Sequence, residues 1–168
     1  MMTIYRLQAD KDYIAQVQKA TQTTDKFGLE PTHGLFGSAE WWQHVRDGTL
    51  PVHHLKGTIS SVHMGSMNDW PEFTLRTETG EEFTWSRFAN CPEFARLYTF
   101  GRPIEVDYVV QRYRATSLGP GTHERIPITI RIDESFTGDG ERKMGSNWGC
   151  PDLTDSGLGV KNPKEEPT

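Results

Sequence analysis

The 168-residue chain lacks a long hydrophobic run and an excess of positive charge, and each absence excludes a class of protein. A membrane-spanning helix needs about eighteen consecutive apolar residues, and no such stretch occurs. The first residues include Arg6, Asp10, Lys11 and Asp12, where a signal peptide needs an unbroken apolar segment. The net charge is −5, so strong nonspecific attraction to nucleic acid would require a local basic patch. We therefore expect neither export nor membrane insertion.

Cysteine is also scarce. Only Cys91 and Cys150 occur, and Cys150 lies in a Gly/Ser-rich stretch that is poorly suited to hold it against a partner. A structural disulfide is therefore not expected, and neither thiol has the close-spaced second cysteine that a zinc site uses. Unpaired cysteines and the lack of an export signal predict a cytoplasmic protein.

Motifs for catalysis and cofactor binding are missing as well. The sequence has no G-x-S-x-G nucleophile elbow, no Walker loop and no dinucleotide fingerprint. His53, His54 and His63 are close in sequence, but strand alternation places the first two on opposite faces of a sheet. His53 and His63 would lie about 33 Å apart along a straight strand. We therefore expect no metal site, no cofactor and no catalytic residue.

Two short amphipathic helices are predicted before residue 51. Asp10 can cap the first, which places Ile14 and Val17 on one apolar face. Ser38 can cap the second, whose sequence is AEWWQHVRD. This helix is expected to end at Gly48, because glycine adopts the left-handed C-cap conformation at least cost.

From residue 52 the apolar period changes from that of a helix to that of a strand. Five strands are predicted, at about 52–63, 73–77, 82–88, 102–114 and 126–132. Gly57 is the position where the long first strand can bend or bulge. The fourth strand has the clearest alternation, with one expected inward set, Ile104, Val106, Tyr108 and Val110, and one expected outward set, Glu105, Asp107 and Gln111.

A short helix is predicted between the third and fourth strands. Asn90 is its expected N-cap, Pro92 stands in the first turn, and Glu93 lies three residues after the cap, where it can complete a capping box. Three strands, a short helix and two strands form an element order that resembles the OB-fold, a five-stranded Greek-key barrel.

This resemblance covers about residues 52–132 and predicts a mainly β fold, α+β by content: a small antiparallel OB-like barrel with N-terminal helices. Another small barrel of the SH3-like kind, or a curled antiparallel sheet with a packed helix, would leave a similar pattern.

Charge and period divide the chain into three expected parts. Lys and Arg number 5 against 6 Asp and Glu over residues 1–51, 9 against 9 over 52–132, and 4 against 8 over 133–168. The last segment has no sustained apolar period. We therefore expect a helical lead-in at 1–51 on or beside the barrel, the barrel at 52–133, and an acidic, mostly irregular tail at 134–168.

The remaining polar and aromatic residues favour recognition over chemistry. OB-like barrels bind ligands through the second and third strands and through the loops after the first and fourth strands. In this sequence those positions hold Trp, Met and Arg, which are residue types that anchor interfaces. We therefore expect a non-catalytic module that binds another protein, through Met64, Met67, Asn68, Trp70, Arg76, Phe88, Arg112, Tyr113, Arg114 and His123.

Two other functions fit parts of the pattern. Aromatic residues beside arginines such as Arg76 and Arg112 would suit single-stranded nucleic acid, although the overall acidity argues against it. Cys91 in the first turn of a helix would be near the positive end of the helix dipole, which activates nucleophilic thiols. A cysteine-dependent enzyme with His63 or His123 as base is therefore the third hypothesis.

Overall fold

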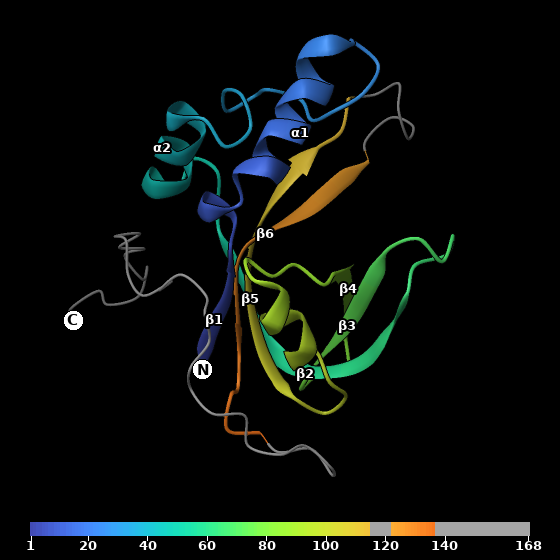
Figure 1. The fold of residues 1–168 in the computed structure, drawn as a ribbon. Coiled ribbons are helices and arrows are strands. Elements are labelled where there is room, and N and C mark those ends of the chain that lie inside the picture. The colour runs from blue at the N-terminus through green and yellow to red at the C-terminus, as the bar shows by residue number, and fades with distance from the viewer. Residues whose placement is uncertain (115–121, 137–168) are drawn as a thin grey trace, which may run out of the picture.

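The computed structural model describes residues 1–114 and 122–136, and its main feature is one curved antiparallel sheet (Figure 1). The strand order is β1-β6-β5-β2-β3-β4, so β1 and β4 are the edges of the sheet and, in the described part of the chain, it does not close. A closed OB-like barrel is therefore not found, and the curled-sheet alternative describes the architecture best. The strands are β1 (Met2–Arg6), β2 (His53–Met64), β3 (Pro71–Thr77), β4 (Glu82–Ser86), β5 (Pro103–Arg112) and β6 (His123–Ile132).

The edge strand β1 is the element that the sequence did not predict. It pairs with β6, with Met2 opposite Ile132, and adds a sixth strand to the five expected ones. A register shift between Thr3 and Tyr5 interrupts the pairing, and Ile4 and Tyr5 are both completely buried. Because two successive residues face the core, β1 lacks the alternation that identifies a strand.

Strand β2 bends where it changes partner, at Gly57. Its first half pairs with β5 from His53 to Thr58, and its second half pairs with β3 from Gly57 to Met64. A Cβ atom added at Gly57 would lie 2.2 Å from the carbonyl oxygen of Arg76, so only glycine allows this close approach. The bend predicted near Gly57 is found there, and Figure 1 shows β2 curving along the lower side of the molecule in this view.

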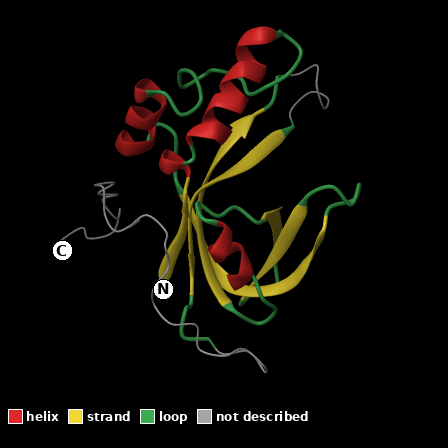
Figure 2. Cartoon of the chain, in the orientation of Figure 1, coloured by secondary structure: helices red, strands yellow, loops and turns green. Residues whose placement is uncertain are grey.

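Both predicted helices of the lead-in are confirmed. They are α1 (Lys11–Thr23) and α2 (Ala39–Asp47), which lie at the same end of the molecule (Figure 2). Asp10 accepts a hydrogen bond from the Tyr13 amide at 3.0 Å, and Ser38 accepts one from the Trp41 amide at 3.2 Å. Gly48 ends α2 with φ of 80°, in the left-handed region. A single 3₁₀ turn, η1 (Leu7–Ala9), precedes α1.

The helix predicted after β4 is a 3₁₀-helix, η2 (Pro92–Leu97), and its cap differs from the prediction. Cys91 occupies the N-cap position and makes no side-chain capping bond. The Asn90 side chain is hydrogen-bonded to the backbone of Arg6 in β1 instead. The capping box expected at Asn90 and Glu93 is therefore wrong.

The two lead-in helices and the sheet share one hydrophobic core. Trp41 of α2 is completely buried, and its indole N–H donates to Gln111 of β5 at 3.0 Å. The amide nitrogen of Gln111 donates in turn to the Glu30 carbonyl at 2.9 Å. This chain of hydrogen bonds joins α2, β5 and the loop after α1. Residues 137–168, most of the predicted tail, lie outside the described residues.

Candidate functional site

The loop between β2 and β3, residues 65–70, is closed by its own hydrogen bonds. The Gly65 amide donates to the Trp70 carbonyl at 2.7 Å, and the Asn68 amide donates to the Gly65 carbonyl at 2.8 Å. Asn68 has φ of 55°, a left-handed conformation that asparagine tolerates better than most residues. These bonds give the β2–β3 loop a defined shape.

Large apolar side chains of this loop and its border are exposed. The exposed fraction is 82% for Met67, 58% for Trp70 and 42% for Met64. Single exposed apolar residues are ordinary, but three within seven residues of an ordered loop form a group that burial against a partner would stabilise.

Beside this loop lies a cleft of about 280 Å³, which we call the aromatic cleft. Trp70 and Phe88, both predicted site residues, line this cleft. The other lining residues come from α1, from the edge strand β4 and its neighbour β3, and from β6. They are Tyr13, Gln16, Glu72, Thr84, Trp85, Ser86, Glu124 and Pro127.

Two of the aromatic rings that line the cleft are fixed by contacts with other residues of the protein. Phe88 packs on Tyr5 and on Tyr13, with ring centroids 5.0 Å and 5.3 Å apart. The Trp85 indole N–H donates to the Arg125 carbonyl at 2.9 Å, which bridges β4 to β6. These contacts fix the rings before any partner binds.

Two carboxylates give the cleft a negative charge. Glu72 lies 3.3 Å from Nε2 of His63, and Glu124 accepts a hydrogen bond from the Tyr113 hydroxyl. Burial, followed by the charges of Glu124 and Asp10, raises the pKa of Tyr13 to about 12. The pKa of Tyr113 is also raised, by burial and then by its hydrogen bond to Glu124. Both tyrosines therefore stay neutral at physiological pH.

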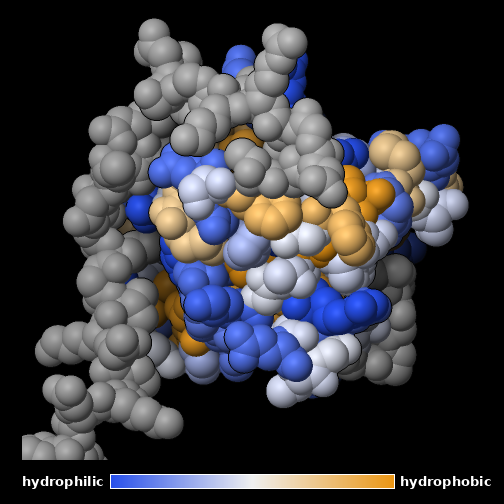
Figure 3. All heavy atoms as spheres, turned by 90° about the horizontal axis from the view of Figure 1, so that it is seen from below, coloured by the Kyte–Doolittle hydropathy of each residue, from blue (hydrophilic) through white to orange (hydrophobic). Residues whose placement is uncertain are grey.

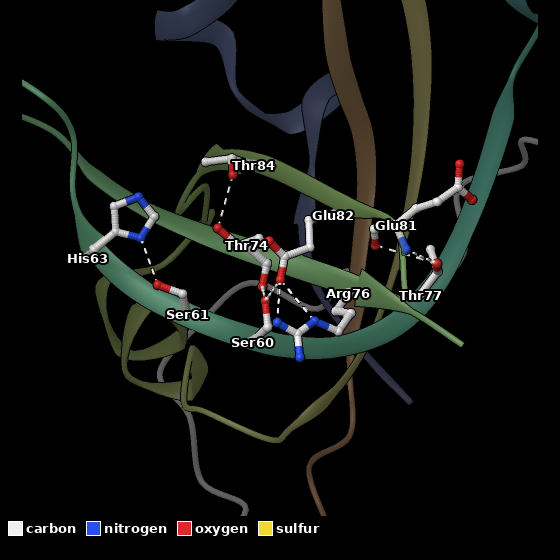
Figure 4. Close-up of polar contacts among 9 residues, drawn as sticks. All are labelled: Ser60, Ser61, His63, Thr74, Arg76, Thr77, Glu81, Glu82 and Thr84. Atoms are coloured by element: carbon white, nitrogen blue, oxygen red, sulfur yellow. Dashed lines mark hydrogen bonds and ion pairs between the residues drawn. The ribbon is translucent and has the colours of Figure 1, made fainter. Parts of the chain in front are cut away.

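Arg76, another predicted site residue, belongs to a polar network on β2, β3 and β4 and does not line the aromatic cleft (Figure 4). Its guanidinium forms an ion pair with Glu82 at 2.7 Å, and this hydrogen bond lowers the pKa of Glu82. Hydroxyl pairs such as Thr74 and Thr84, at 2.9 Å, continue the network. Arg76 is thus engaged within its own hairpin.

The predicted site residues around the loop between β5 and β6 differ in their surroundings. Arg112 and His123 are exposed partners at the ends of β5 and β6. The Arg114 guanidinium donates to the carbonyls of Thr24 and Phe27 after α1, so it stabilises the end of that helix. Arg76 and Arg114 are therefore each engaged within the protein, whereas Arg112 is exposed. Residues 115–121 of the predicted loop lie outside the described residues.

The histidines do not assemble a metal site. Over residues 1–114 and 122–136, no group of three or more His, Cys, Asp or Glu side chains could hold a metal ion. His53 stacks on Tyr108 with ring centroids 5.2 Å apart, and Nδ1 of His54 lies 2.7 Å from Asp107. These two neighbours bind different groups, as strand alternation predicts.

Cys91 does not have the surroundings of a nucleophile. It is 6% exposed and precedes a 3₁₀-helix of six residues instead of an α-helix. It is also disulfide-bonded, so the expectation of unpaired cysteines is wrong at this position. Cys150 lies outside the described residues. A cysteine-dependent enzyme therefore has no structural support.

One face of the molecule has a mixed surface. The end of the molecule in Figure 3 shows apolar groups separated by hydrophilic ones. None of the helices in the described part of the chain combines the length and apolar character needed to cross a membrane.

Several cleft residues were missed by sequence reasoning because they come from distant segments. Tyr13 and Gln16 belong to α1, and Glu124 and Pro127 belong to β6. Nothing in their local patterns shows that α1 and β6 meet the hairpin of β3 and β4. The only indication in the sequence was the apolar face of the first helix. This face predicted that the helix packs on another element but did not show which one.

The described residues bring exposed apolar side chains of the β2–β3 loop beside a cleft lined by aromatic rings. Residues 1–133 match the family model of Immunity protein RhsI2, and the chain belongs to this family. Immunity proteins are non-enzymatic inhibitors that bind toxins, so the role of this chain is protein–protein binding. Membership gives no support to nucleic-acid binding. A search of curated proteins finds no match.

Proposed function

We propose that the chain neutralises its cognate Rhs toxin by binding it through the β2–β3 loop and the aromatic cleft, together called the loop–cleft surface. The observation that carries this proposal is the exposure of Met67 and Trp70, 82% and 58%, on a loop that borders the cleft. Family membership supports a protein partner, and the apolar loop supports this location on the surface.

The loop–cleft surface is suited to tight binding because it is ordered in advance. The hydrogen bonds between Gly65 and Trp70 and between Asn68 and Gly65 already define the loop. Ordering a flexible segment on binding costs about 0.5–1.5 kcal/mol for each immobilised side chain, and an ordered loop avoids part of this cost. Tryptophan also ranks among the residues that contribute most to interfaces.

The test replaces Met67 and Trp70 together by Ala and measures binding to the purified toxin domain by calorimetry. We expect affinity to fall at least tenfold and protection of toxin-expressing cells to be lost. Phe100→Ala is the matched control, because Phe100 is 76% exposed but lies after η2, away from the loop–cleft surface. Equal affinities of the two variants would contradict the location that we propose.

The cytoplasmic location predicted from the sequence is part of the same proposal. The disulfide at Cys91 is the observation against it, because disulfides are rare in the cytosol. Fractionation of cells that express the full chain tests the compartment. Recovery outside the cytoplasmic fraction would overturn this part of the proposal and leave toxin binding unaffected.

A further inference from the structure

We infer that the aromatic cleft receives one cationic side chain, an arginine or a lysine, from the bound toxin. This inference rests on the proposed function and adds to it the chemistry of the contact. It follows from the size of the cleft, the rings that line it and the charge that it carries.

The size of the cleft suits a side chain. Its volume of about 280 Å³ lies just below the range of about 300–1,000 Å³ that is typical of small-molecule sites. Trp70 at its border belongs to the exposed loop that we propose as a toxin contact. A partner that covers this loop would therefore also cover the mouth of the cleft.

The lining rings favour a cation. Tyr13, Trp70, Trp85 and Phe88 all line the cleft. A guanidinium or ammonium group within about 6 Å of such a ring is attracted by the negative face of its π-system, most strongly for tryptophan. Because Trp70 is 58% exposed, its ring remains accessible to a partner.

Each carboxylate of the cleft has one polar neighbour in the described structure. Glu124 accepts from the Tyr113 hydroxyl. Glu72 lies 3.3 Å from Nε2 of His63, whose Nδ1 lies 3.0 Å from the Ser61 hydroxyl. Among the lining residues that are described, none is a lysine or an arginine, so the wall of the cleft supplies no permanent cation to Glu72 and Glu124.

Other occupants would be disfavoured. An acidic side chain would be repelled by Glu72 and Glu124. An aliphatic side chain would take both carboxylates out of water without adding a charged partner for them, which is costly. A cation gains from both the rings and the carboxylates.

The experiment compares the double variant Glu72→Gln, Glu124→Gln with the matched control Glu78→Gln, Glu81→Gln. The control pair makes the same change in net charge at exposed positions around the turn between β3 and β4, outside the cleft. Unfolding midpoints show that each variant is folded. With the purified toxin domain, we expect the cleft variant to bind at least tenfold more weakly than the wild type and the control variant to bind within about twofold of it.

Two failures can be told apart. If the wild-type chain does not bind the toxin, the proposed function fails. If the wild type binds and the folded cleft variant binds as tightly as the control, only the present inference fails.

A second measurement locates the cation on the toxin. Arginines of the toxin are modified with a dicarbonyl reagent and lysines with an acetylating reagent, in complexes of equal saturation, and mass spectrometry identifies the protected residues. We expect one cationic residue to be protected by the wild-type chain and to react in complex with the cleft variant. Identical protection patterns for the two complexes would overturn the inference.

Discussion

The side chain of Asn90 makes two hydrogen bonds with the backbone of Arg6, 84 positions earlier in the sequence. The Arg6 amide donates to Oδ1 at 2.6 Å, and Nδ2 donates to the Arg6 carbonyl at 3.2 Å. The Asn90 amide also donates to the Ile4 carbonyl at 3.1 Å. Because Asn90 follows the edge strand β4 and Arg6 ends the other edge strand β1, side-chain bonds join regions that strand pairing leaves apart.

Replacing Asn90 by Ala should therefore destabilise the fold. The change leaves the amide and the carbonyl of Arg6 without their Asn90 partners, and we expect a loss of about 1–3 kcal/mol in the free energy of unfolding. Urea denaturation measures it. Asn90→Asp keeps the Oδ1 acceptor and should lose less, whereas an unchanged midpoint for Asn90→Ala would show that the bonds contribute nothing.

Asn90 also illustrates what local sequence can and cannot predict. Asp10 and Ser38 cap the helices that directly follow them, so their roles depend on near neighbours and were predicted correctly. Asn90 has the same local pattern, but its side chain is hydrogen-bonded to the backbone of β1. The choice between a local cap and a distant backbone is made by tertiary structure, which the pattern does not contain.

The alternation of β5 fails for a related reason. Ile104 and Val106 are buried as predicted, but a register shift between Asp107 and Tyr108 places both Tyr108 and Val109 in the core. Beyond the shift, the positions of β5 predicted to face inward and outward are therefore exchanged. Gln111, predicted to face outward, is only 3% exposed. The shift skips Ile128 of β6, the neighbouring strand, and has no signature in the sequence of β5, so the sequence predicted β5 and misplaced its last residues.

Gln111 should for this reason be important for stability. Gln111→Leu removes the partners of the Trp41 indole N–H and the Glu30 carbonyl, which lie 3.0 Å and 2.9 Å from the amide group. We expect a loss of about 1–3 kcal/mol in the free energy of unfolding. Urea denaturation monitored by Trp fluorescence measures this loss. Gln43→Leu, at an exposed position of α2, should change it by less than about 0.5 kcal/mol. Similar effects of the two substitutions would refute a special role for Gln111.

Gly57 should be the least replaceable glycine of the sheet. In Gly57→Ala the new Cβ would meet the Arg76 carbonyl oxygen at 2.2 Å, and this backbone atom cannot move without breaking the pairing of β2 and β3. A loss of at least about 1–3 kcal/mol is expected from such overpacking. In Gly65→Ala the nearest atom, at 3.2 Å, is the end of the Glu72 side chain, which can rotate away. Thermal denaturation should therefore separate the two variants clearly, and equal melting temperatures would contradict the close approach at Gly57.

The candidate site was predicted only in part. Trp70 and Phe88 were chosen from residue type and expected loop position, and both line the aromatic cleft. Arg76 and Arg114 were chosen on the same grounds, but each is bound to a nearby group of its own protein. Residue type identifies side chains able to bind a partner. Whether they are already engaged within the fold depends on contacts between distant segments.

The ion pair of Arg76 and Glu82 provides a prediction about pH. The hydrogen bond from Arg76 lowers the pKa of Glu82 below its ordinary value of 4.5, so the bond contributes stability above that pH and loses it as the pH falls through the lowered pKa. An NMR titration of the side-chain carboxyl carbons should find the Glu82 midpoint below 4.5 in the wild type and closer to it in Arg76→Met. Asp47 is the internal control, because its pKa is lowered by hydrogen bonds from Thr49 and should not respond to the substitution. A Glu82 midpoint that is the same in both proteins would show that Arg76 does not hold this carboxylate in solution.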